Sequence, residues 1–290
     1  MMLLTENRTR FRKAPHQEKR AEVLKTVGMI GIGAIARHVV EHWQTIGQEY
    51  ELRSLLARRA LSDRPAGCGP ATRIFSKPED FLAMPTDIVV EAAGHAAVAS
   101  LGPDLLEQGR SLYLLSVGAL ADDALSDRLC RAALQGGGRI LLPCGALAGF
   151  DGLLALTRHQ NAQVTYTSRK PVHAWAGTVA ATRHDLSTVT EPLTIFEGSA
   201  REAARQFPQN ANLAAAVAFA GVGLDATRII LIADPHITEN IGTIDASGPL
   251  GTLNVTVQGR AAQDNPKTSA IVGASVLSAL ANQTAEIRFI

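Results

Sequence analysis

The sequence has few cysteines, few aromatic residues and almost no net charge. Of its 290 residues three are cysteines and 4% are aromatic, and 28 Lys and Arg stand against 27 Asp and Glu, which leaves a net charge of +1. Cys68, Cys130 and Cys144 form no CxxC pair, which excludes a disulfide framework and a cysteine-built zinc site. A balanced charge provides no field that would recruit nucleic acid or an acidic membrane. Small molecules are therefore the expected partners.

Long apolar runs and paired-histidine motifs are missing as well. No stretch of about 18 uncharged apolar residues occurs, so we expect no membrane-spanning segment. Residues 1–20 lack the apolar core of a signal peptide, and the HxH and HExxH spacings of metal sites do not occur. These features predict a cytoplasmic protein without a metal site. Residues 1–24 are basic and aperiodic, which predicts a solvated arm, with a nucleic-acid-binding tail as the alternative.

The first half of the chain alternates between two kinds of segment. The length predicts two domains, and 46% hydrophobic residues suffice for a sizeable core. Short apolar segments of strand type alternate with segments of helical spacing, which indicates right-handed βαβ units and a doubly wound parallel sheet of the Rossmann type. The strand segments are residues 26–30, 52–57, 87–91, 111–116 and 139–142, and the helical ones are 34–43, 98–108 and 121–134.

After Pro143 the pattern changes. Residues 164–168, 228–233 and 252–258 alternate with period two, and residues 210–221 form an Ala-rich helix that is apolar nearly all round. Half-solvated strands beside buried helices predict a second, smaller α+β domain. The expected division is an arm at 1–24, a dinucleotide-binding domain at 25–145 joined by the C-terminal helix 266–290, and a catalytic and dimerisation domain at 146–265. The helical pattern of that last segment runs from Thr268 to Ala281, and Thr268 or Ser269 could cap it.

A glycine-rich turn follows the first strand segment. In the sequence GIGAIA at 31–36, Gly31 permits a tight turn and Gly33 lets the backbone approach a pyrophosphate. Ala34 and Ile35 begin the following helix, whose free N–H groups and positive dipole end favour phosphate. The flanking strand and helix supply the context that such a motif requires. We therefore expect a nicotinamide dinucleotide here, with a purely structural turn as the alternative.

The residues after the second strand segment bear on the choice of cofactor. In NAD-binding domains an Asp or Glu at this position hydrogen-bonds the free ribose 2′-hydroxyl, whereas this sequence has Arg58 and Arg59. Guanidinium groups suit a 2′-phosphate, so the sequence favours NADP over NAD, although two solvated surface arginines would look the same. NAD or NADP is the expected cofactor.

Several other side chains are weaker candidates. His95 follows a strand segment and could face the nicotinamide or be a plain loop residue. Cys144 lies in a small-residue stretch and has no evident partner that would make it a nucleophile. Lys170, Lys267 and Arg201 are the cations that could bind an acidic substrate, or they could be solvated surface residues.

The chain resembles the L-aspartate dehydrogenase family from about residue 26 to residue 282. In the first half the resemblance rests on GIGAIA at 31–36, EAAG at 91–94, SVGA at 116–119 and GALAG at 145–149. In the second half it rests on FEGSAREA at 196–203, FPQNAN at 207–212, GVGLDAT at 221–227 and NPKTS at 265–269.

The resemblance implies roles for particular residues. Ala146 and Asn212 match positions that bind the nicotinamide cofactor, Asn212 next to the substrate. The family's catalytic histidine lies in an Asn-x-His segment, which here reads Asn240-Ile-Gly242, so that glycine replaces the histidine. His236 and His184 are the histidines that we expect to compensate. Lys170 and Thr268 are the expected substrate anchors.

The resemblance also implies an activity. It is the NAD(P)-dependent oxidative deamination of L-aspartate to oxaloacetate and ammonia through iminoaspartate, together with the reverse reductive amination. A homodimer built on the second sheet and a place in pyridine nucleotide biosynthesis follow from the same resemblance. Two alternatives stay open because of Gly242: an enzyme for a bulkier amino acid, imine or 2-oxo acid, and a dinucleotide-binding protein that has lost catalysis.

Overall fold

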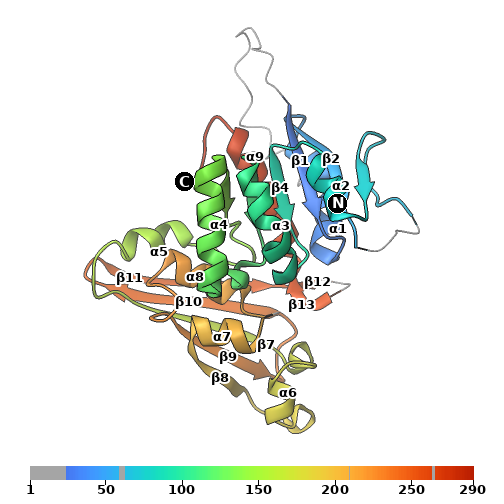
Figure 1. The fold of residues 1–290 in the computed structure, drawn as a ribbon. Helices are drawn as coiled ribbons and strands as arrows, with labels where there is room; N and C mark the ends of the chain where they lie inside the picture. The colour runs from blue at the N-terminus through green and yellow to red at the C-terminus, as the bar shows by residue number, and fades with distance from the viewer. Residues whose placement is uncertain (1–23, 59–62, 209, 263–264) are drawn as a thin grey trace, which may run out of the picture.

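The computed structural model describes residues 24–58, 63–208, 210–262 and 265–290. The expected arm, apart from Leu24, and Arg59 therefore lie outside the described residues. Two large β-sheets with their helices, and a small two-stranded sheet, make up the described chain (Figure 1).

The first sheet is the predicted doubly wound Rossmann sheet. Its strand order is β3-β2-β1-β4-β5-β6, and each neighbouring pair is parallel. The strands are β1 (Lys25–Ile30), β2 (Tyr50–Leu56), β3 (Arg73–Phe75), β4 (Ile88–Glu91), β5 (Ser111–Leu114) and β6 (Arg139–Leu141). The helices between them are α1 (Ala34–Glu41), η1 (Trp43–Ile46), α2 (Pro78–Ala83), α3 (His95–Glu107), η2 (Val117–Ala121) and α4 (Asp123–Gly136). The central strands are buried on both faces, as their unbroken apolar runs require.

The second sheet is mixed and has the order β11-β10-β7-β9-β8. Only β7 and β9 run parallel to each other. Its strands are β7 (Gln163–Pro171), β8 (Leu193–Ser199), β9 (Arg228–Asp234), β10 (Asn240–Gly248) and β11 (Gly251–Gly259). Buried and half-exposed residues alternate along β7 and β9, as the period-two pattern predicted. The predicted second α+β domain is confirmed.

Helices cover the inner face of this second sheet. The helices α5 (Phe150–Leu156), α7 (Ala200–Gln206) and α8 (Asn212–Ala220) pack against its strands. The five consecutive residues 214–218 of α8 are buried, in agreement with the helix that the sequence predicts as apolar nearly all round. The remaining short elements are η3 (Val172–Trp175), α6 (Ala180–Arg183), η4 (Leu186–Thr188), β12 (Ala261–Ala262) and β13 (Asn265–Ser269).

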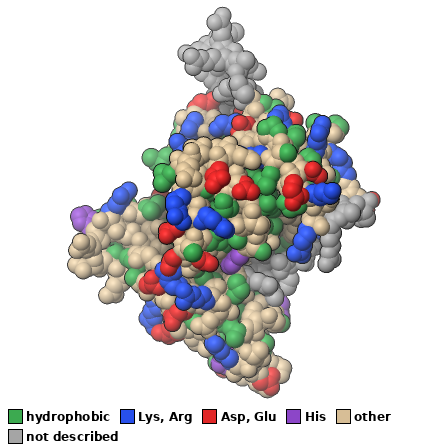
Figure 2. Space-filling model, viewed as in Figure 1, with side chains coloured by type: hydrophobic (Ala, Val, Ile, Leu, Met, Phe, Trp, Pro, Cys, Tyr) green, Lys and Arg blue, Asp and Glu red, His purple; other side chains and the backbone are tan. Residues whose placement is uncertain are grey.

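The C-terminal helix α9 (Ile271–Thr284) returns to the first sheet (Figure 1). Val276, Leu277 and Leu280 join the core that β1, β2 and α1 form, and the Tyr50 hydroxyl donates a hydrogen bond of 2.8 Å to the Leu280 carbonyl oxygen. The chain therefore passes from the first sheet to the second and back again. Among the described helices none is long and apolar enough to cross a membrane. On the face that Figure 2 shows, acidic and basic side chains are interspersed.

Candidate active site

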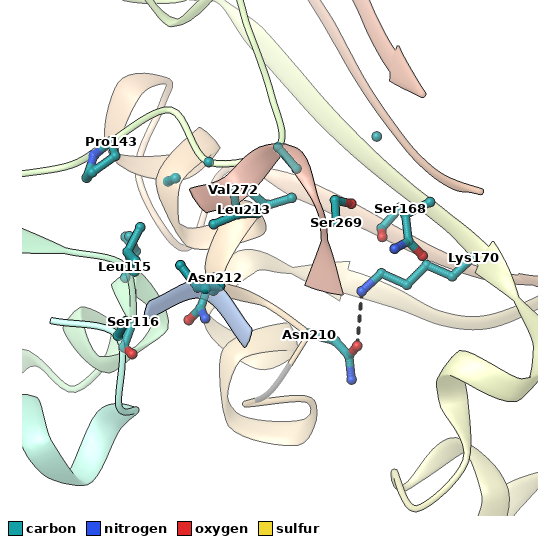
Figure 3. Close-up of a pocket in the computed structure, with 18 of the residues that line it drawn as sticks. Leu115, Ser116, Pro143, Ser168, Lys170, Asn210, Asn212, Leu213, Ser269 and Val272 are labelled. Carbon is teal, nitrogen blue, oxygen red and sulfur yellow. Dashed lines mark hydrogen bonds between the residues drawn. The ribbon is translucent and has the colours of Figure 1, made fainter. Parts of the chain in front are cut away.

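A cavity of about 240 Å³ lies where the two sheets meet. From the first domain it is lined by loops at the carboxyl ends of β4, β5 and β6, the side on which parallel sheets bind their ligands. From the second domain it is lined by β7, β10 and the start of α8, and the C-terminal segment adds Ser269 and Val272. In Figure 3, Ser116 and Asn212 lie on one side of the cavity, and Ser168 and Lys170 lie on the other.

The glycine-rich turn lies at the start of α1. Gly31 has a φ of +105°, and a Cβ there would lie 2.6 Å from the Ala92 carbonyl oxygen, so only glycine fits. Gly33 differs, because its φ is −70° and a Cβ there would meet no atom within 4 Å. Gly33 therefore faces open space in front of the N–H groups of α1. This is the cradle that a pyrophosphate requires, and Ala34 and Ile35 begin the helix behind it.

A buried carboxylate holds the loops around this cradle. Glu91, at the end of β4, is 1% exposed. Its Oε1 accepts hydrogen bonds of 2.7 Å from the backbone N–H groups of Ala93 and Gly94, and one of 3.0 Å from the Ser116 hydroxyl. Its Oε2 accepts a fourth bond of 3.0 Å from the Ser116 N–H. Glu91 thus fixes the loops after β4 and β5 relative to each other.

Asn212 joins the two domains at the cavity. Its Oδ1 accepts a hydrogen bond of 3.0 Å from the Gly118 N–H, and the Nε2 atom of His95 lies 3.3 Å from the same oxygen. Asn212 comes from α8 of the second domain, whereas His95 and Gly118 belong to the first. Ala146 lines the same cavity, so both residues that the resemblance connects with the nicotinamide lie in one site.

Lys170 places a positive charge in the cavity. The residue is 8% exposed, and its Nζ lies 3.1 Å from the Asn210 Oδ1 and 5.6 Å from the centre of the Trp175 ring. The dashed line in Figure 3 marks the bond to Asn210. Among the described residues that line the cavity, Lys170 is the only charged one. A buried ammonium group in such a lining favours an anionic ligand.

Gly242 lies on β10 and also lines the cavity. It pairs with Ser168 of β7 and with Val257 of β11. A Cβ at residue 242 would lie 2.8 Å from the Leu147 Cδ2 atom and 3.2 Å from the Tyr166 hydroxyl oxygen. The space beside the glycine is thus occupied by these two side chains rather than enlarged.

The two histidines that we expected to compensate lie elsewhere. His236 is exposed in the turn after β9, where its Nε2 is 3.4 Å from Glu191. His184 ends α6 and lines a separate surface hollow with Arg183 and Thr194. Neither is among the residues that line the cavity.

The other candidates are placed as follows. Arg201 binds Asp123 and Asp225 at 2.9 and 2.6 Å, so it links the two domains rather than facing the cavity. Arg58 is exposed directly after β2. Burial raises the pKa of the Cys144 thiol, which opposes a role as nucleophile. The side chains of Lys267 and Thr268 lie outside the described residues, and Thr268 is in β13 rather than at a helix start.

Several polar residues of the site were not singled out from the sequence, among them Glu91, Tyr166, Ser168 and Asn210. Tyr166 and Ser168 precede Lys170 at intervals of two, which places all three on one face of β7. That spacing was visible in the sequence and could have identified them. Within the described part of the chain, no three His, Cys, Asp or Glu residues come together as a metal site.

Comparison with known proteins gives consistent matches. Residues 151–283 match the family model described as aspartate dehydrogenase, C-terminal, and residues 31–143 match the NAD binding domain of homoserine dehydrogenase. The chain is 39% identical over 260 residues to an L-aspartate dehydrogenase of Cupriavidus necator, covering 89% of this chain and 97% of that protein. It is 40% identical over 254 residues to L-aspartate dehydrogenase 2 of Bordetella bronchiseptica, covering 88% and 95%.

A solved structure has the same fold. The aspartate dehydrogenase of Thermotoga maritima superposes with a TM-score of 0.71 at 23% identity, and the match covers 92% of this chain and 99% of that one. The match spans both domains. The sequence relatives show that this chain belongs to the L-aspartate dehydrogenase family.

Proposed function

We propose that the protein is an NAD(P)-dependent amino-acid dehydrogenase that converts L-aspartate to oxaloacetate and ammonia through iminoaspartate, and that it also catalyses the reverse reaction. One observation carries the proposal. A single cavity brings Asn212 and Ile35, which belongs to the helix behind the dinucleotide cradle, together with the buried ammonium group of Lys170. Such a site can hold a carboxylate substrate against a nicotinamide ring.

The chain's own residues fit the cofactor. The open space at Gly33 and the N-terminus of α1 suit a pyrophosphate, held by Gly31, Gly33, Ala34 and Ile35. Arg58 follows β2 at the position from which it would bind a 2′-phosphate. Ala146 and Asn212 orient the nicotinamide. When bound, that ring supplies the acceptor for the hydrogen and the two electrons that leave the substrate Cα.

The substrate is held on the opposite side of the cavity. Lys170 binds a substrate carboxylate, and Asn210 and the Trp175 ring keep its ammonium group in place. Asn212 contacts the substrate beside the ring, and Thr268 is a second anchor in our proposal. A bulkier substrate finds no support, because Leu147 and Tyr166 already fill the space beside Gly242.

The test is an assay of cofactor reduction at 340 nm with L-aspartate and either NADP or NAD. We expect steady reduction, and a lower KM for NADP. In Lys170→Met the KM for L-aspartate should rise about 10- to 100-fold, the equivalent of one charge-assisted hydrogen bond, while cofactor affinity is unchanged. The matched control is Lys25→Met. Lys25 is the exposed first residue of β1 and does not line the cavity.

Two results would contradict this proposal. An enzyme that reduces neither cofactor with L-aspartate, although it binds one of them, would refute the activity. An unchanged KM in Lys170→Met would remove Lys170 as the carboxylate anchor.

Assembly and cellular role belong to the same proposal. Ile230 and Ile232 are half-buried on the outer face of the second sheet, which makes that face suitable for a homodimer interface. The family resemblance supports a cytoplasmic enzyme that supplies iminoaspartate to pyridine nucleotide biosynthesis. Cys68, Cys130 and Cys144 are all free thiols, as a reducing compartment allows.

A further inference from the structure

Three polar side chains form a row on the inner face of β7. Tyr166, Ser168 and Lys170 are buried, they alternate with half-exposed residues, and all three line the cavity. The proposed function uses Lys170 and leaves the two hydroxyl groups without a role. Of these, Tyr166 is 1% exposed, so its phenol is shielded from bulk water.

The absence of a side chain at Gly242 leaves room for the phenol. Gly242 is the β10 residue that pairs with Ser168, in the middle of the row. A Cβ at residue 242 would lie 3.2 Å from the Tyr166 hydroxyl oxygen and 3.4 Å from the Cε2 atom of its ring. Any larger side chain would therefore stand against the hydroxyl group. Because residue 242 is glycine, the Tyr166 hydroxyl group is the polar group beside its Cα atom, where the side chain of the family's histidine would start.

The chemical state of this phenol limits what it can do. Burial raises the pKa of Tyr166 to about 12, although a hydrogen bond with Ser168 partly lowers it. The phenol is therefore neutral near pH 7, and no phenolate is present that could act as a general base. A neutral hydroxyl can still accept one proton while it donates another, and Ser168, the next side chain on the same face of β7, is its hydrogen-bonding neighbour.

We propose, on the basis of the proposed function, that Tyr166 is a catalytic residue that relays protons between oxygen and nitrogen during hydrolysis of iminoaspartate, with Ser168 as its positioning residue. The relay takes the place of the histidine that Gly242 replaces. It needs no change in the net charge of the site.

The steps balance as follows. Water attacks the protonated imine carbon, a C–O bond forms, and the π electron pair of the C=N bond moves to nitrogen. Tyr166 takes one proton from the added oxygen and gives its own proton to nitrogen. The C–N bond then breaks with its electron pair going to nitrogen, while a second relay moves the remaining hydroxyl proton to the departing ammonia. Protonated imine and water become ketone and ammonium, and the phenol is regenerated.

The experiment separates the first turnover from steady turnover. The variant Tyr166→Phe keeps the ring and removes only the hydroxyl group. Stopped-flow absorbance at 340 nm should show one equivalent of reduced cofactor per site formed at the wild-type rate. Steady release of ammonium, measured in the same reactions, should fall about 100-fold, the low end of the usual effect of a general acid–base group.

Two further variants complete the test. Ser168→Ala retains the phenol and should slow ammonium release about five- to tenfold, the rate equivalent of one neutral hydrogen bond. Tyr113→Phe is the matched control, because Tyr113 is a buried tyrosine on β5 that does not line the cavity. It should leave both phases unchanged. If Tyr166→Phe does not fold, Ser168→Ala carries the test alone.

The contradicting outcomes differ from those of the proposed function. Ammonium release by Tyr166→Phe within about twofold of the wild type would overturn the relay alone, since a general acid–base group contributes far more. So would an equal loss of the first turnover, because the hydroxyl would then serve binding or the preceding step. A wild type that does not turn over L-aspartate overturns the proposed function and the relay with it.

Discussion

At the scale of single residues, the two glycines of the first turn have different physical roles. Gly31 is required by the backbone, because its φ is positive and the Ala92 carbonyl oxygen occupies the position of a Cβ. Gly33 has an ordinary φ and open space in front of it. The fold therefore requires glycine at residue 31 but not at residue 33, where we propose that the open space receives the ligand.

This difference predicts opposite results for two alanine variants. Gly31→Ala should destabilise the protein by about 1–3 kcal/mol, the usual cost of forcing a side chain into a strained backbone conformation. Gly33→Ala should lower the free energy of unfolding by only about 0.5–1 kcal/mol, the usual difference between glycine and alanine at a helix N-cap, because its φ is ordinary and a Cβ there meets no atom. Its Kd for the dinucleotide should rise on the order of tenfold, since the methyl group obstructs the pyrophosphate.

The measurements are chemical denaturation and a cofactor titration by fluorescence for both variants. Equal cofactor affinity of Gly33→Ala and the wild type would place the pyrophosphate elsewhere.

At the scale of elements, local signals set where α4 begins and ends. Asp122 is the N-cap residue, and its Oδ1 accepts hydrogen bonds of 3.0 and 3.2 Å from the N–H groups of Ala124 and Leu125. Gly137 ends the helix in the left-handed conformation, with a φ of +74°. These are the residue types that helix termini prefer.

The cap gives a prediction for stability alone. Asp122→Ala should lower the free energy of unfolding by about 1 kcal/mol and leave turnover unchanged, because Asp122 does not line the cavity. Asp127→Ala is the control, as this aspartate is exposed within the same helix. Urea denaturation compares the two variants, and an equal effect in both would contradict the capping role of Asp122.

Several elements were not predictable from periodicity. The strand β10 consists of Asn, Thr, Asp, Ser and Gly alternating with a few apolar residues, so its strand propensity is weak. The sequence therefore predicts no strand at residues 240–248. It becomes a strand because β7 and β11 pair with it on both sides. Residues 265–269 pair as β13, so the last helix starts at Ile271 rather than at the predicted residue 268.

At the scale of the whole molecule, the outer face of the second sheet gives a prediction for assembly. If the homodimer forms there, light scattering should give twice the chain mass of 30.7 kDa. Ile230→Glu should give the mass of one chain, because a charge on an apolar interface is costly to desolvate. Leu134→Glu is the control, since Leu134 is 84% exposed on α4 of the other domain. A wild-type monomer, or an Ile230→Glu dimer, would contradict this interface.

The two domains are held together by contacts that are distant in sequence. The helix α9 packs on α1, Arg201 reaches Asp123, and the Asn212 side chain binds the Gly118 N–H. These contacts determine how the dinucleotide cradle faces the second sheet. Asn212, Ala146 and Lys170, which sequence reasoning put forward, all line the cavity, whereas His236 and His184, which it also put forward, do not.

By itself the sequence determined the two kinds of sheet, the glycine-rich turn and the family, because these depend on periodicity and on short motifs that act locally. The shared face of Tyr166, Ser168 and Lys170 is implicit in their spacing of two, but the strand that we expected ended at residue 168 and did not include Lys170. Only the tertiary structure decided that Gly242 lies beside Ser168 and that Tyr166 and Leu147 fill the adjacent space. The register of β10 on β7 connects residues more than 70 positions apart, and no local propensity specifies such a pairing.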